Sequence, residues 1–223
     1  FDESNISLID TQDELCESHN DVFRAASINP DDPALILFTS GSTGMPKGVL
    51  HTFRSLTSKW TNLLQYVDLD MCERTLCILP THFGHGLICN SLYPLVNGKT
   101  LVILPKPDVT TAFHLGSFID KYKITFMSSV PSIWHLVLKL SKPPIGQTLK
   151  QVHIGSAPLS AELWSKVCVW SGTKRVWNTY GITETGSWVA GPVTDQEPLP
   201  HDGYIGQGWG AEIIVAPTGS QPI

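Results

Sequence analysis

The sequence predicts an α/β protein in which helices flank a mainly parallel sheet. Apolar runs of strand length alternate along the chain with longer stretches that have helical periodicity. Polar or glycine-containing motifs directly follow several predicted strands, where ligands bind in sheets of this kind. The chain has 223 residues, of which 42% are hydrophobic and 16% are charged, so it can bury a globular core.

The expected elements can be placed in chain order. The expected strands are 34–38, 75–79, 100–104, 124–127, 151–154, 175–177 and 213–215. The expected helices are 53–67, 111–122, 131–140 and 160–170, and the apolar segment 86–95 also has helical length. Pro131 suits the first turn of a helix, Ser160 is a candidate N-cap, and proline-containing turns separate several units.

Composition divides the chain into three regions. Residues 1–33 form a polar lead-in with a helical turn or two expected at 10–20, and residues 34–190 form the α/β core. Residues 191–223 are rich in glycine and proline and are expected to begin a β-rich segment. The first residues, Phe1-Asp2-Glu3, are neither an initiator methionine nor a signal peptide, so we expect the chain to be cut from a longer protein.

Charge and cysteine usage exclude several classes of protein. A net charge of −5 without a basic stripe disfavours nucleic-acid binding, and no apolar run reaches the ~18 residues of a membrane span. The five cysteines include no C-x-x-C pair, which disfavours a disulfide framework or a structural zinc site. Reduced thiols in a cytoplasmic protein are the expected alternative.

The strand expected at 34–38 runs directly into a loop of small and hydroxyl-bearing residues. Glycines allow close backbone approach, successive N–H groups form an anion site, and a lysine adds a mobile positive charge. The sequence therefore predicts a polyphosphate cradle made by Thr39, Ser40, Gly41, Ser42, Thr43, Gly44 and Lys47. It is not a Walker P-loop, because Val49 follows Gly44 and Gly48 where that motif needs a lysine.

A second polar motif, residues 178–186, follows the strand expected at 175–177. Tyr180 could stack on a purine, Thr183 could donate to a phosphate, and Glu184 could hold a magnesium ion. Taken alone, the same segment also fits an ordinary polar loop.

The two motifs together resemble the AMP-forming adenylating enzymes, which include acyl-CoA synthetases, peptide-synthetase adenylation domains and firefly-type luciferases. Residues 39–48 resemble the signature loop of that superfamily, and Tyr180-Gly-Ile-Thr-Glu184 matches its Tyr-Gly-x-Thr-Glu motif. Residues 155–159 resemble its Gly-Gly-Ala-Pro-Leu segment, with Ser156 in place of a glycine or alanine. The resemblance implies that the chain is the central part of the large N-terminal domain of an adenylate-forming enzyme.

The resemblance also implies roles for individual residues toward ATP and Mg²⁺. The implied catalytic residues are Lys47, Phe83, Thr183 and Glu184, with Glu184 as the magnesium ligand and Thr183 near the α-phosphate. Besides the phosphate loop and Thr183, the implied nucleotide-binding residues are Gly155, Ser156, Ala157, Pro158, Asn178, Thr179, Tyr180 and Gly181.

The segment Pro80 to Leu87 is expected to border the pocket for a small carboxylic acid. Counting from Pro80 places Phe83 at the family's gate position, with His82 one place early and His85 beyond it. A metal site at His82, His85 and Cys89 is disfavoured because a fourth ligand is missing.

Other residues are expected to line the acid tunnel. These are Val130, Pro131, Ile154 and residues 187–189. Trp188 either faces the tunnel, which would favour a short or flat acid, or packs close to the surface of the protein. No aspartate lies between Met71 and Asp108, which disfavours an α-amino acid because its amine would lack a partner.

The predicted function is that of an acid–thiol ligase. The acid is activated as an acyl-adenylate with release of pyrophosphate, and a thiol, expected to be coenzyme A, then takes the acyl group. The alternatives are an adenylation domain that loads a carrier protein, an enzyme whose adenylate has another fate, and a non-catalytic nucleotide-binding fragment. The ribose-binding aspartate and the catalytic lysine of the family are expected beyond Ile223, so the chain alone is expected to turn over little.

Overall fold

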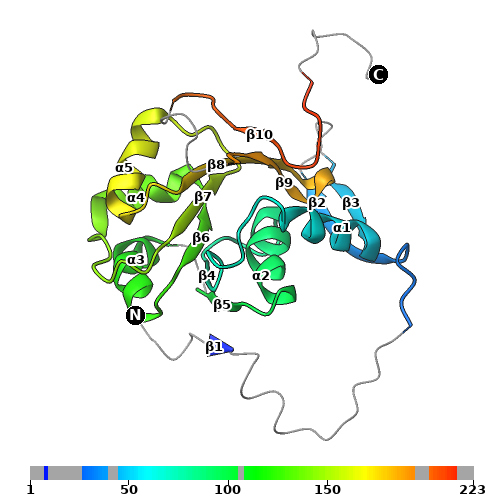
Figure 1. Ribbon diagram of the computed structural model, residues 1–223, viewed down its shortest axis with the longest axis horizontal. Coiled ribbons are helices and arrows are strands. Elements are labelled where there is room, and N and C mark those ends of the chain that lie inside the picture. Colours follow the sequence, from blue (N-terminus) through cyan, green and yellow to red (C-terminus); the bar gives the residue numbers. More distant parts are fainter. Residues whose placement is uncertain (1–7, 10–26, 40–44, 105–107, 194–200, 215–223) are drawn as a thin grey trace, which may run out of the picture.

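An eight-stranded sheet runs through the centre of the protein in the order β1-β5-β4-β6-β7-β8-β9-β10 (Figure 1). The computed structural model describes residues 8–9, 27–39, 45–104, 108–193 and 201–214. The strands of this sheet are β1 (Leu8–Ile9), β4 (Arg74–Cys77), β5 (Thr100–Ile103), β6 (Phe126–Ser129), β7 (Gln151–Gly155), β8 (Val176–Ile182), β9 (Ser187–Gly191) and β10 (Gln207–Gly208).

The five central strands, β5, β4, β6, β7 and β8, pair in parallel. The edge strands β1, β9 and β10 pair antiparallel with their neighbours. The register sets Leu76, Met127, Val152 and Val176 side by side across four strands. The predicted α/β fold with a mainly parallel sheet is confirmed.

Helices cover both faces of the sheet (Figure 1). They are α1 (Phe53–Leu63), the π-helix η2 (His85–Leu92), α2 (Tyr93–Val96), α3 (Val109–Lys121), α4 (Pro131–Leu140), α5 (Ala161–Ser171) and the short 3₁₀-helix η3 (Thr183–Thr185). The side chains of Asp108 and Ser160 accept hydrogen bonds from backbone N–H groups in the first turns of α3 and α5. Within the described residues, no helix is both long enough and apolar enough to cross a membrane.

The core has two layers because neighbouring residues of a strand point to opposite faces. Met127 and Val176 pack in the layer beneath α3, α4 and α5, whereas Phe126 and Trp177 pack in the layer that includes residues of α1, η2 and α2. The second layer is unusually aromatic, with Trp188 and Trp209 adding to Phe126 and Trp177.

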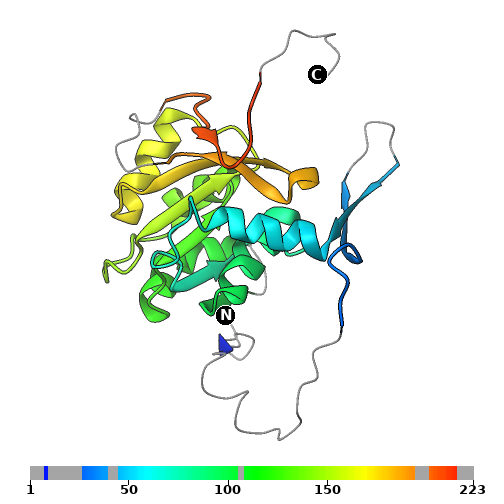
Figure 2. The same ribbon diagram turned by 45° about the vertical axis from the view of Figure 1, so that its right-hand side comes forward.

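The strand expected at 34–38 does not belong to the central sheet. It forms β2 (Pro33–Thr39), which pairs antiparallel with β3 (Lys47–Thr52) in a separate two-stranded sheet that stands away from the main sheet in Figure 2. Leu37 is buried, but Ile36 and Phe38 are 53% and 67% exposed. The expectation of a buried strand was wrong. A continuous apolar run predicts a strand that is buried on both faces, but this hairpin buries only one of its faces.

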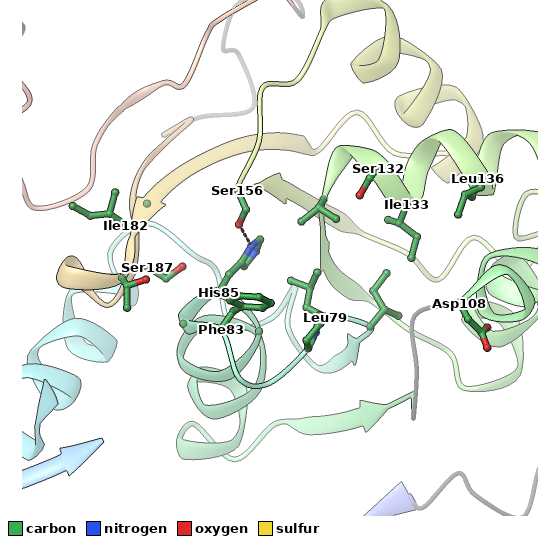
Figure 3. Close-up of a pocket in the computed structure, with 17 residues that line it drawn as sticks. Leu79, Phe83, His85, Asp108, Ser132, Ile133, Leu136, Ser156, Ile182 and Ser187 are labelled. Carbon is green, nitrogen blue, oxygen red and sulfur yellow. Dashed lines mark hydrogen bonds between the residues drawn. The ribbon is translucent and has the colours of Figure 1, made fainter. Parts of the chain in front are cut away.

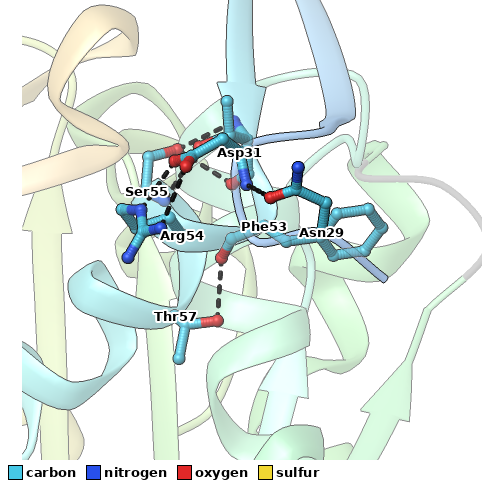
Figure 4. A network of polar contacts seen from close by, with 7 residues as sticks. Asn29, Asp31, Phe53, Arg54, Ser55 and Thr57 are labelled. Carbon is cyan, nitrogen blue, oxygen red and sulfur yellow. Dashed lines mark hydrogen bonds and ion pairs between the residues drawn. The ribbon is translucent and has the colours of Figure 1, made fainter. Parts of the chain in front are cut away.

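The start of α1 fixes the base of this hairpin (Figure 4). Thr52 and Ser55 form a reciprocal capping box, in which each side chain accepts from the other residue's backbone N–H. The guanidinium of Arg54 donates to both carboxylate oxygens of Asp31, at 2.6 and 2.9 Å. Hydrogen bonding to Arg54 lowers the pKa of Asp31. The turn before β2 is therefore tied to the helix after β3.

The structure differs from three further expectations about the type or bounds of helices and strands. The apolar segment 86–95 is π-helical before it becomes α2, and the helix expected at 53–67 ends at Leu63. Ile213 and Ile214 are not in a strand, and β10 lies earlier, at 207–208. Val215 and the helical turn expected at 10–20 lie outside the described residues.

Trp134 should be a major contributor to stability. Its indole is fully buried on α4, donates to the Ser129 hydroxyl at 2.7 Å and packs edge-on against Trp170. We expect Trp134→Ala to lower the free energy of unfolding by about 3–5 kcal/mol, measured by urea denaturation. Leu140→Ala, at a more exposed position of the same helix, should lower it by less than about 1 kcal/mol. Equal losses in the two variants would contradict this packing.

Candidate functional site

A pocket of about 570 Å³ opens at the carboxyl ends of the parallel strands (Figure 3). Its wall is formed by the segments that directly follow β4, β6 and β7, by Asp108 at the start of α3, and by the end of β8. Parallel strands bring these segments to one edge of the sheet, which is where α/β folds bind ligands. Most of the lining is apolar and includes Ile78, Leu79, Val130, Ile133, Leu136 and Ile182.

His85, the first residue of η2, provides a buried polar group of the pocket wall. Its Nδ1 lies 2.8 Å from the Ser156 hydroxyl, and its Nε2 lies 2.6 Å from the Ser128 hydroxyl. Burial lowers the pKa of His85 to about 4. The imidazole is therefore neutral at pH 7, and each of its nitrogens faces a hydroxyl.

Ser156 lies in the turn between β7 and α5 with a backbone φ of +65°, a conformation that side chains other than glycine rarely adopt. The residue before it must be glycine, because a Cβ at Gly155 would lie 2.7 Å from the Thr179 carbonyl oxygen. The pairing of Gly155 with Thr179 sets the exposed residues Ser156, Ala157 and Pro158 next to the end of β8.

The motif at 178–186 is not a loop. Tyr180 to Ile182 extend β8 and pair with β9, and the chain then turns through η3. Tyr180 is 44% exposed, Thr183 lines the pocket, and the Glu184 side chain is exposed beside it. An exposed ring, a hydroxyl and an exposed carboxylate fit the predicted partners: a purine, a phosphate and a magnesium ion.

The structure places Asn178 and Thr179 differently from the other predicted nucleotide-binding residues. Both side chains are buried, and they donate to the backbone oxygens of Tyr204 and Ile154, respectively. Gly181 lines the pocket and is close to β9, since a Cβ there would lie 2.2 Å from the Ser187 carbonyl oxygen.

The predicted phosphate loop connects β2 and β3, and Ser40, Gly41, Ser42, Thr43 and Gly44 lie outside the described residues. At the mouth of the loop, Thr39 pairs with Lys47 across the hairpin, and its hydroxyl donates to the Lys47 carbonyl at 3.4 Å. The Lys47 side chain is exposed.

His51 of β3 connects this hairpin to the Thr183–Glu184 turn. Its side chain is 3% exposed and its Nε2 has no partner among the described residues. Burial lowers the pKa of His51, while a hydrogen bond with the Thr183 backbone and the Glu184 charge oppose that shift. Strand β3, which follows the predicted phosphate loop, therefore contacts the turn that carries Glu184, the predicted magnesium ligand.

The predicted acid-pocket residues divide between the pocket and the core. Phe83, Val130 and Ser187 line the pocket, with the Phe83 ring 55% exposed and 4.1 Å from the ring of His82. Ile154 and Trp188 are buried in the core. Trp188 matches neither expectation, because it does not line the pocket and is only 2% exposed, with its ring 5.7 Å from that of His85.

Sequence reasoning missed three side chains that shape the site: Ser128, His51 and Lys59. The Lys59 ammonium, on α1, donates to the Trp188 carbonyl, and its stem packs over Gly186. Burial lowers the pKa of Lys59. No local signal marks these residues, because their partners are distant in sequence.

Known proteins are similar in sequence to this chain over most of its length. The family model described as AMP-binding enzyme matches residues 2–220. A dimodular nonribosomal peptide synthase of Bacillus subtilis is 31% identical over 94% of the chain, which spans 9% of that protein. A 4-coumarate–CoA ligase-like protein of Oryza sativa is 31% identical over 87% of the chain, which spans 35% of its length.

Two solved structures are similar in fold. The inhibitor-bound N-terminal domain of FACL13 from Mycobacterium tuberculosis matches 83% of the chain with a TM-score of 0.72 at 24% identity. ATP-bound MatB from Rhodopseudomonas palustris matches 81% with a TM-score of 0.67 at 27% identity. The chain spans 45% and 35% of these two structures, so it corresponds to part of a larger domain.

Protonation of His85 should destabilise the fold. Its pKa is about 4 in the folded protein and returns toward 6.5 on unfolding, so the unfolded chain binds the extra proton between these values. The free energy of unfolding should therefore fall as the pH drops from 6.5 toward 4, and the His85 share at pH 4.5 should be about 2–3 kcal/mol.

The matched measurement compares the chain with His85→Gln by urea denaturation at pH 7.0 and pH 4.5. The difference between the two proteins at pH 7.0 reports what the neutral imidazole contributes through packing and hydrogen bonding. The change between the two pH values reports protonation. His153, whose pKa burial also lowers, should leave a residual pH dependence in the variant. The same change with pH in both proteins would show that His85 does not titrate this way.

Proposed function

The chain belongs to the AMP-binding enzyme family, and on that premise we propose that it is part of an ATP-dependent ligase for a small carboxylic acid. The observation that supports this most is the pocket itself. Thr183 of the Tyr-Gly-x-Thr-Glu motif and Ser156 of the segment 155–159 border the same apolar cavity. An acid in this cavity would have its carboxylate beside the residues that the family uses for the nucleotide.

The proposed reaction has two steps. A carboxylate oxygen of the acid bonds to the α-phosphorus of ATP, and the bond to the β-phosphate breaks to release pyrophosphate. A thiol sulfur then bonds to the acyl carbon, its proton is lost, and AMP leaves. The result is a thioester, with coenzyme A as the proposed acceptor.

The residues of the chain bind and orient the reactants in this scheme. Lys47 and the Thr183 hydroxyl contact phosphate oxygens, and the Tyr180 ring stacks on the adenine. Glu184 would hold Mg²⁺, which neutralises phosphate charge when bound. The apolar wall excludes water, which strengthens these electrostatic interactions.

The pocket lining favours an acid without a second negative charge. Among the described residues that line it, none is a lysine or arginine, and the carboxylate of Asp108 borders it on the side of Leu136 (Figure 3). A second carboxylate would have no cationic partner among these residues. We therefore propose a short monocarboxylic acid, in a pocket bordered by the exposed ring of Phe83.

The principal alternative is an adenylation domain that loads a carrier protein, which the similarity to the peptide synthase supports. Two observations weigh against an amino acid substrate. The sequence has no aspartate between Met71 and Asp108, and the carboxylate of Asp108, which borders the pocket, accepts a hydrogen bond from the Thr111 backbone as the N-cap of α3. The pocket-lining segment after β4 is mostly apolar. A non-catalytic nucleotide-binding role is the second alternative.

Binding of Mg·ATP tests the nucleotide half of the proposal. We expect the chain to bind Mg·ATP in isothermal titration calorimetry and Lys47→Ala to weaken binding about tenfold or more, since a charge-assisted hydrogen bond is lost. Lys139→Ala, at an exposed position of α4, is the matched control and should leave the affinity unchanged. Glu184→Gln should remove the dependence of ATP affinity on magnesium. Unchanged ATP affinity in both Lys47→Ala and Glu184→Gln would contradict these roles.

ATP–pyrophosphate exchange tests the acid half. In a protein that continues past Ile223 we expect exchange with acetate, propionate, butyrate or benzoate, and little with malonate or alanine. The 223-residue chain alone should turn over little. Exchange that required an α-amino acid would favour the carrier-loading alternative instead.

A further inference from the structure

Three side chains from distant parts of the sequence form one hydrogen-bonded chain at the pocket wall. The imidazole of His85 connects the hydroxyl of Ser128, which is fully buried on β6, to the hydroxyl of Ser156, which lines the pocket. Figure 3 shows Ser156 pointing toward His85. Ser156 is thus the pocket-facing end of this series of hydrogen bonds, and Ser128 is its end inside the protein.

The hydrogen bonds between Ser128, His85 and Ser156 can be donated in either direction. A neutral imidazole has one N–H and one lone pair, and a hydroxyl can donate or accept. When Nε2 carries the proton, it donates to Ser128, and Ser156 donates to Nδ1 and presents lone pairs to the pocket. When Nδ1 carries the proton, it donates to Ser156, whose own O–H is then free to point into the pocket. Ser156 can therefore accept from a ligand hydroxyl or donate to a ligand carbonyl.

The backbone at Ser156 is held in a conformation that glycine would adopt more easily. Its φ of +65° disfavours any side chain with a Cβ, yet the position carries a serine whose hydroxyl is bound by a buried histidine. Backbone strain of this kind is retained where the side chain has a use. The contact that distinguishes serine from glycine at this position is the hydrogen bond between its hydroxyl and His85.

Ser156 also lies partway along the pocket. Figure 3 shows it with His85 between Ile182 on one side and Ile133 and Leu136 on the other. Thr183 follows Ile182, so the carboxylate end of a bound acid belongs on that side in the proposed reaction. The apolar end belongs beside Ile133 and Leu136, and Ser156 faces the part of the acid between them.

We propose that Ser156, positioned by His85, binds an oxygen-bearing group in the middle of the acid. The substrate class would be short acids with a hydroxyl or carbonyl group between the carboxylate and an apolar end. This inference rests on the proposed function, since it assigns the carboxylate to the Thr183 end of the pocket. Ser156 is then the specificity-determining residue of the site.

The test compares acids that differ by one oxygen. NMR titration of the ¹⁵N-labelled chain with butyrate, 2-hydroxybutyrate, 3-hydroxybutyrate and 3-oxobutyrate gives the dissociation constants. We expect at least one of the oxygenated acids to bind about tenfold more tightly than butyrate, since a hydrogen bond is gained in a site built to make it. Equal affinities for all four acids would overturn the proposal.

Substitutions test whether Ser156 causes the preference for the oxygenated acid. Ser156→Ala and Ser156→Gly should both bring the affinity for the oxygenated acid down to that for butyrate, and the glycine variant also removes the backbone strain. Ser132→Ala, which removes another hydroxyl of the pocket wall, is the control and should preserve the advantage. If the Ser156 variants weakened the binding of butyrate as much as the binding of the oxygenated acid, the hydroxyl would hold the carboxylate. The proposal would then be wrong.

Mg·ATP binding by the unsubstituted chain separates this inference from the proposed function. Normal ATP binding and butyrate binding without an oxygenated-acid preference would overturn the role of Ser156 alone. Absence of ATP binding together with absence of binding by every acid would overturn the proposed function, and with it this inference.

Discussion

Parallel pairing of β5, β4, β6, β7 and β8 is the constraint on which the site depends. Strands that run in the same direction must end at the same edge, so five segments that are distant in sequence meet there. The helices that return the chain pack on both faces and leave that edge open. The pocket is therefore a consequence of topology, and its chemistry depends on the residue that follows each strand.

Burial then determines the state of the polar groups at this edge. His85 is hydrogen-bonded to two serine hydroxyls, and removal from water lowers its pKa until it is neutral. The aromatic layer behind it, with Trp188 and His153, completes that environment. In the proposed function, a neutral imidazole suits the pocket, because it would orient a hydroxyl without pairing with the carboxylate of the acid.

Much of the fold could be predicted from the sequence because local signals agreed with the tertiary structure. The helix expected at 131–140 has these bounds in the structure, since Pro131 marks its first turn. The strands at 75–79, 100–104 and 151–154 are found within a residue or two. The hairpin was misplaced because its apolar residues, including Ile36 and Phe38, satisfy the pattern of a buried strand while one face stays exposed.

The site was predictable only where a motif is contiguous. The segments around Ser156 and Thr183 were found because the residue types stand side by side in the sequence, and the structure brings both to one pocket. The contact of Ser128 with His85 spans 43 residues and that of His85 with Ser156 spans 71, so neither has a local signal. The burial of Asn178 and Thr179 also depends on the sheet, which sequence motifs do not describe.

In the proposed function, the acyl group and the nucleotide meet at the edge where Ser156 and Thr183 lie. A crystal structure of the chain with a stable acyl-sulfamate analogue of butyryl-AMP tests this meeting point without relying on turnover. We predict that the adenine lies against Tyr180, that the sulfamate lies beside Thr183, and that the butyryl chain enters the pocket past His85 and Phe83. An acyl chain bound elsewhere, with this pocket empty, would contradict the proposed function.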